Sequence, residues 1–110
     1  MFLLAALLLP LGAMASERVA LVIGNAAYQT APLKNPVNDA RAMSTRLEAL
    51  GFVVTTLENA TRAEMGDAIA GFEQSLGPDK VALFYFAGHG IQVRSRNFLV
   101  PVDALSLIHI

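Results

Sequence analysis

A histidine between two glycines closes a long apolar run in this sequence. Residues 81–87 are all apolar or aromatic, and Gly88, His89 and Gly90 follow them directly. Such a run, ended by glycine, predicts a β-strand that is buried on both faces. Buried strands of open α/β sheets present their functional groups at their carboxyl ends. His89 is therefore the first candidate for a functional side chain.

Two strands and a helix are predicted upstream of this segment. Residues 18–24 and 52–57 are the strands, and Gly51 ends the helix between them as a left-handed cap residue. Asn35 is the expected N-cap, and Pro36 stands at the first helical position, where its missing N–H costs nothing. The apolar stripe of this helix consists of Val37, Ala40, Met43, Leu47 and Leu50.

A second helix and a hairpin complete the pattern. Thr61 and Glu64 form a capping box, and Gly77-Pro78 ends the helix. Its stripe consists of Met65, Ala68, Ile69, Phe72 and Leu76. Residues 91–93 and 98–100 are expected to pair around 94–97. The order β-α-β-α-β plus a hairpin predicts a mostly parallel sheet with helices on its faces. The loop 24–39 and His89 should then lie together.

Composition limits the possible partners and suggests export. The chain has 110 residues and a net charge of −1, which is room for one domain and gives no indication of nucleic-acid binding. Residues 1–15 carry no charged side chain, and Ala13 and Ala15 precede an expected cleavage before Ser16. We interpret residues 1–15 as a signal peptide and expect a secreted or periplasmic protein. An uncleaved anchor is the alternative, but about 10 apolar residues do not span a bilayer of about 30 Å.

Several common site chemistries do not fit the residues. The sequence has no dinucleotide-binding glycine pattern, no Gly-Lys-Ser/Thr phosphate loop and no Gly-x-Ser-x-Gly elbow. His89 has no further ligand at metal-binding spacing, so neither a metal nor another cofactor is expected. A lone histidine in a glycine-flanked loop suits a proton acceptor for a nucleophile, and the Gly90 N–H suits an oxyanion.

Residues 86–90 and 97–104 resemble the large-subunit (p20-like) domain of bacterial caspase-like and metacaspase-like cysteine peptidases (peptidase C14 type). Residues 18–25 are similar to the first strand of that family, and residues 35–40 to its helix entry. The resemblance covers about residues 17–104. It implies a three-layer α/β/α caspase-like fold, with residues 16–104 as a partial p20 domain. The apolar tail 105–110 departs from the family, and we interpret it as a non-native end of a truncated fragment.

The resemblance also implies site residues. His89 matches the catalytic histidine of a cysteine endopeptidase acting on peptides or proteins, and Gly90 matches its oxyanion donor. The family cysteine lies on the next core strand, which is not among these 110 residues, and the sequence has no cysteine. The fragment is thus predicted to be inactive and to leave a bare apolar sheet edge beside residues 81–87. Asp39 matches a substrate-binding acid that favours Arg or Lys. Leu33 or Lys34 stands where a caspase-type arginine is expected.

Structural roles remain open for each of these residues. His89 could be satisfied by backbone carbonyls, and Asp39 could serve only the dipole of its helix. Tyr28 is expected to be a packing residue, and Asn25 to order its loop through side-chain-to-backbone bonds. His109 is assigned no function. The alternative function is a non-catalytic caspase-like module that binds peptides or partner domains. A cysteine on the next strand of the full-length protein would decide between the two functions.

Overall fold

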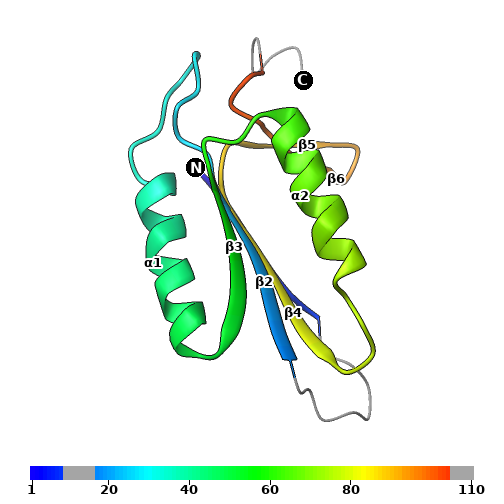
Figure 1. The fold of residues 1–110 in the computed structure, drawn as a ribbon. Coiled ribbons are helices and arrows are strands. Elements are labelled where there is room, and N and C mark those ends of the chain that lie inside the picture. Colours follow the sequence, from blue (N-terminus) through cyan, green and yellow to red (C-terminus); the bar gives the residue numbers. More distant parts are fainter. Residues whose placement is uncertain (9–16, 105–110) are drawn as a thin grey trace.

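A mixed four-stranded sheet forms the centre of the computed structural model, which describes residues 1–8 and 17–104. Its strands are β1 (Phe2–Leu8), β2 (Glu17–Gly24), β3 (Phe52–Glu58) and β4 (Lys80–Gly88), in the order β1-β4-β2-β3 (Figure 1). β2 runs parallel to both β3 and β4, and β1 runs antiparallel to β4. The predicted mostly parallel α/β sheet is confirmed.

Two helices cover opposite faces of this sheet (Figure 1), α1 (Pro36–Ala49) and α2 (Arg62–Gln74). Alternating residues of β2 face the two helices, as the period of two in a strand requires. Ala20 and Val22 pack in a cluster with Ala40 and Leu47 of α1, whereas Leu21 and Ile23 pack with Met65 of α2. β2 is therefore buried on both faces, and the fold has three layers.

The helix ends agree with the sequence except at Asn35. Thr61 and Glu64 form the expected capping box, with both reciprocal hydrogen bonds present. Gly51 has φ 86° and follows Leu50, the C-cap residue of α1, so it is the left-handed residue that ends the helix. Asn35 does precede α1, but its backbone is already helical and its side chain makes no capping bond. Asn35 contributes its backbone instead, because its carbonyl accepts from the Asp39 N–H at 2.8 Å.

The buried stripe of α1 differs from the predicted stripe. Ala40 and Leu47 are buried as expected, but Leu50 lies beyond the helix end and is 58% exposed. Ser44 is buried instead, and its hydroxyl lies 2.7 Å from the hydroxyl of Thr56 on β3. A polar residue can occupy this position because the facing strand supplies its hydrogen-bond partner.

The turn of the hairpin has fewer residues than predicted. β5 (Gly90–Val93) pairs antiparallel with β6 (Arg96–Leu99), so only Arg94 and Ser95 connect them. Both connecting residues have positive φ, 50° and 66°, as a two-residue hairpin turn of this kind requires. Val100 lies after the hairpin and is fully buried.

The largest departure from the sequence prediction is at the edge of β4. This edge was expected to be bare, but Phe2–Leu8 pairs with it over seven residue pairs, from Phe2 opposite Gly88 to Leu8 opposite Ala82. An apolar N-terminal segment and an unpaired strand edge satisfy each other's hydrogen bonds in this way.

The export signal stays a prediction, because the expected cleavage site lies outside the described residues, as does the tail 105–110. No helix within residues 1–8 and 17–104 is long and apolar enough to cross a membrane.

Candidate active site

His89 lies at the carboxyl end of β4, between that strand and β5. Its backbone N–H donates to the Tyr28 hydroxyl at 3.0 Å, and its carbonyl accepts from the Val100 N–H at 3.0 Å. The chain thus places this residue at the sheet edge where the sequence predicted it, and fixes its backbone from two distant segments.

The imidazole ring of His89 has one defined polar partner. Its Nε2 lies 2.6 Å from the carbonyl oxygen of Ala31. A carbonyl can only accept, so Nε2 carries the proton in this contact, and in the neutral ring Nδ1 holds the free lone pair. Ala31 itself has φ 56°, in the left-handed region that residues with a side chain rarely adopt. The backbone of this loop is therefore strained at Ala31, the residue whose carbonyl contacts His89.

Asn25 connects this loop to two other segments. Its side chain is fully buried, its Oδ1 accepts from the Ala60 N–H at 2.8 Å, and its Nδ2 donates to the Val100 carbonyl at 3.2 Å. The predicted loop-ordering role through backbone groups is confirmed. Asn59 adds a second tie, because its Oδ1 accepts from the N–H groups of Ala26 and Ala27 at 3.0 and 2.9 Å. The contribution of Asn59 could not be read from its sequence position.

Tyr28 does more than the packing that the sequence predicted. Its side chain is only 5% exposed, and its hydroxyl donates to the Val100 carbonyl at 2.8 Å. Its ring lies 4.5 Å from the His89 ring between centroids, tilted by 52°. Burial raises the pKa of Tyr28, although its hydrogen bond with His89 opposes that shift.

The two glycines beside His89 leave room for different neighbours. A Cβ at Gly88 would lie 2.6 Å from the Tyr28 hydroxyl, so a side chain there would displace the tyrosine. A Cβ at Gly90 would lie 2.6 Å from the ring of Phe2 on β1. The Phe2 ring therefore lies against Gly90, the residue predicted to be the oxyanion donor.

Asp39 lies in the first turn of α1, at the same end of the sheet. A Cβ at Gly24 would lie 2.4 Å from the Pro36 carbonyl, so the start of this helix rests on the carboxyl end of β2. Asp39 is half-buried, and its charge contributes to a raised pKa of Tyr85 on β4, after the larger effect of burial. The polar partner of His89 is a backbone carbonyl rather than this carboxylate.

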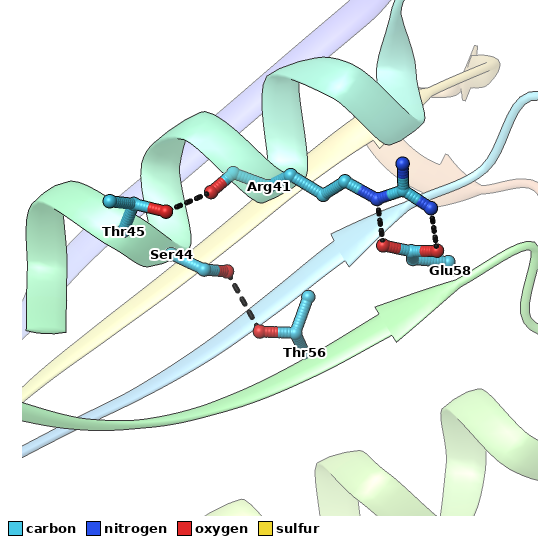
Figure 2. A network of polar contacts seen from close by, with 5 residues as sticks. All are labelled: Arg41, Ser44, Thr45, Thr56 and Glu58. Atoms are coloured by element: carbon cyan, nitrogen blue, oxygen red, sulfur yellow. Dashed lines mark hydrogen bonds and ion pairs between the residues drawn. The ribbon is translucent and has the colours of Figure 1, made fainter.

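An exposed ion pair holds the helix that carries Asp39. Arg41 of α1 donates through Nε and one terminal nitrogen to the two carboxylate oxygens of Glu58, at 2.6 and 2.8 Å (Figure 2). This bidentate contact lowers the pKa of Glu58. Figure 2 also shows the Ser44–Thr56 contact one turn further along, so α1 is tied to β3 at two successive levels.

Among the residues that the structure describes, no group of three His, Cys, Asp or Glu side chains could hold a metal ion.

Comparison with known proteins assigns the family. The caspase domain model of the peptidase C14 family matches residues 17–110. The human mucosa-associated lymphoid tissue lymphoma translocation protein 1 is 39% identical over 92 residues, and its mouse homolog gives the same values. The match covers 83% of this chain but only 11% of each relative, so the chain spans about a tenth of their length. With its three-layer fold and its family match over most of its length, the chain belongs to the caspase domain family of peptidases.

Proposed function

We propose that this domain supplies the histidine and the oxyanion donor of a cysteine endopeptidase. The observation that carries the proposal is the His89 contact with Ala31, in which a backbone carbonyl satisfies Nε2, as a structural histidine also requires, but leaves Nδ1 with its lone pair. A histidine whose Nε2–H is held by a carbonyl has Nδ1 as its only site for taking up a proton. Two backbone hydrogen bonds keep the residue at the carboxyl end of β4, where a reacting group is useful.

The proposed reaction follows from these atoms. Nδ1 of His89 accepts the proton of a cysteine thiol, and the resulting thiolate attacks the peptide carbonyl. The Gly90 N–H donates to the developing oxyanion. The imidazolium then returns the proton to the leaving amine, and water completes the hydrolysis of the acyl-enzyme. The 110 residues contain no cysteine, so this mechanism needs a thiol from outside them.

We further propose that Asp39 binds the basic side chain of a substrate. The carboxylate lies at the active end of the sheet and is half-buried, which strengthens its attraction for a guanidinium or ammonium group. A purely local effect on the α1 dipole is the alternative role, which the specificity assay separates from this one.

The test uses the complete polypeptide encoded by the gene that contains this chain, assayed with fluorogenic peptides ending in Arg, Lys or Ala. Proton transfer by a positioned side chain contributes about 10²–10⁴-fold, so His89→Ala should lower kcat/KM by at least about 100-fold. His109→Ala is the matched control and should leave the rate unchanged. The 110-residue chain alone should show no turnover. Full activity of the His89→Ala variant would refute the proposed mechanism.

The proposed role of Asp39 in binding a basic side chain is tested in the same assay. Asp39→Asn should reduce the preference for Arg over Ala by about 30-fold or more, because unpairing a partly buried charge costs about 2–5 kcal/mol. Asp67→Asn, an exposed change on α2, is the control. A preference that stays unchanged in Asp39→Asn would leave Asp39 with its helix-dipole role alone.

A non-catalytic binding module is the second candidate, and one contact favours it. The Phe2 ring lies against the Gly90 backbone, so in this structure an apolar group already occupies a position beside the proposed oxyanion donor. A binding module would use that surface for a peptide strand without hydrolysing it. Peptide binding by the complete polypeptide that persists without any cleavage, and without loss in His89→Ala, would favour this function.

A further inference from the structure

Three hydrogen bonds form a closed cycle around the His89 backbone. The Tyr28 hydroxyl accepts from the His89 N–H at 3.0 Å and donates to the Val100 carbonyl at 2.8 Å. The Val100 N–H in turn donates to the His89 carbonyl at 3.0 Å. Each group in such a cycle is both fixed and polarised by its neighbours. The only side chain in the cycle is that of Tyr28.

The same tyrosine also contacts the imidazole ring. Its ring centroid lies 4.5 Å from that of His89, in a tilted arrangement typical of favourable aromatic pairs. Ala31, whose carbonyl meets Nε2 at 2.6 Å, comes three residues later in the same loop. One loop thus contacts the imidazole through an aromatic ring and through a hydrogen-bond acceptor.

The ends of this loop are bonded to each other and to Asn59. The Leu33 N–H donates to the Ala26 carbonyl at 2.9 Å, which closes the loop upon itself. Asn59 accepts from the Ala26 and Ala27 N–H groups. The glycine at position 88 leaves room for the Tyr28 hydroxyl, which a Cβ would approach to 2.6 Å. The tyrosine is therefore fixed at its backbone and at its hydroxyl.

We propose that Tyr28 is a positioning residue for His89, which holds the imidazole with Nε2–H on the Ala31 carbonyl and Nδ1 available. The consequence for peptide cleavage rests on the proposed function, whereas the ring orientation is a property of this chain. Tyr28 is not itself a proton donor to substrate, because its hydroxyl proton is already given to Val100 and burial raises its pKa.

The test compares two tyrosine variants of the 110-residue chain by NMR. Tyr28→Phe removes the hydroxyl from the cycle. Tyr85→Phe makes the same change at the other tyrosine, which lies on β4 and is buried like Tyr28. All samples carry His109→Ala, so that the only imidazole signals come from His89. Spectra are recorded at a pH of about 9, well above the ordinary imidazole pKa of about 6.5. The readouts are the Nε2–H proton resonance and its exchange rate with water.

A positioned ring should show a protected Nε2–H resonance in the parent chain. Tyr28→Phe should speed its exchange by about tenfold or more, the scale of one lost hydrogen bond. Tyr85→Phe should leave it unchanged. Ser44→Ala, which removes a buried hydroxyl contact to β3, controls for lower stability: it should speed exchange of core amides without affecting the His89 ring.

Two outcomes would overturn the inference: an unchanged Nε2–H signal in Tyr28→Phe, or an equal change in Tyr85→Phe or Ser44→Ala. The measurement involves no peptide, so it separates this inference from the proposed function. If the ring signal changes as expected and the complete polypeptide does not cleave peptides, the peptidase proposal fails and the positioning role stands. If the polypeptide is active, Tyr28→Phe should lower kcat by about tenfold or more, with KM nearly unchanged.

Discussion

β4 has a different neighbour on each side, and the two are packed very differently. β2 pairs with it in parallel, and Leu21, Val22 and Ile23 of that strand are completely buried. β1 pairs with it antiparallel, yet Leu3, Leu7 and Leu8 remain 54–55% exposed. Both neighbours satisfy the backbone of β4, so hydrogen bonding does not explain the contrast.

The helices explain it. β2 lies between α1 and α2 and buries side chains on both faces, whereas only one face of β1 joins a core cluster, through Phe2 and Leu4. Burial of a side chain contributes about 1.5–3 kcal/mol, so a strand covered on one face obtains much less stabilisation than one covered on both. β2 and β4 thus form the stable centre of the sheet, and β1 is its weakly held edge.

The largest test of this comparison is removal of a side chain from the centre. Phe86 is fully buried on β4, and Phe86→Ala should lower the free energy of unfolding by about 3–5 kcal/mol. Leu7→Ala on β1 is the matched truncation and should cost less than about 1 kcal/mol, as expected at an exposed position. Urea denaturation of both variants measures the difference. Equal losses would show that β1 is as much a part of the core as β4.

Two glycine substitutions test the same contrast through steric clashes. A Cβ at Gly24 would lie 2.4 Å from a backbone oxygen of α1, so Gly24→Ala should cost about 1–3 kcal/mol through overpacking. The three atoms nearest to a Cβ at Gly90 all belong to the Phe2 side chain, which can move with its weakly held strand. Gly90→Ala should therefore cost less than Gly24→Ala in thermal denaturation. The reverse order would contradict the description of β1 as a yielding edge.

Breaking the β1 ladder directly should have a smaller effect. Ala5 pairs with Tyr85, and Ala5→Pro removes a backbone donor and distorts the strand. The loss of one or two ladder bonds should cost about 1–2 kcal/mol. Hydrogen exchange should show β4 amides losing protection on the β1 side while β2 amides keep theirs. Uniform loss of protection across β2 and β4 would indicate one cooperative unit instead.

The smallest expected effect is a loss of folding stability at alkaline pH, caused by the two buried tyrosines. Burial raises the pKa of Tyr28 and Tyr85, so the folded chain keeps both phenols protonated to higher pH than the unfolded chain does. Their contribution is complete below a pH of about 10 and is lost as pH rises through the folded pKa values. The urea midpoint should therefore fall above about pH 10, and less steeply in Tyr28→Phe. An identical slope in that variant would mean that Tyr28 does not titrate differently on folding.

Much of the architecture is determined by local sequence signals. The capping box at Thr61, the left-handed Gly51 and the proline at the start of α1 each act within a few residues, so they work wherever the segment lies. The apolar run of β4 and the glycine that ends it likewise place His89 at a strand end through local sequence alone. Alternation of apolar segments with helical stripes was enough to predict the parallel centre of the sheet.

Only the tertiary structure decided the contacts between distant segments. Nothing local predicts that Tyr28 and Asn25 share the Val100 carbonyl, because those partners lie 72 and 75 residues away. The same is true of Phe2–Leu8, whose sequence suits a secretory signal as well as it suits an edge strand. A strand edge accepts any segment that supplies matching N–H and C=O groups and apolar side chains. The register of β1 and the environment of His89 therefore depended on what the folded chain brought within reach.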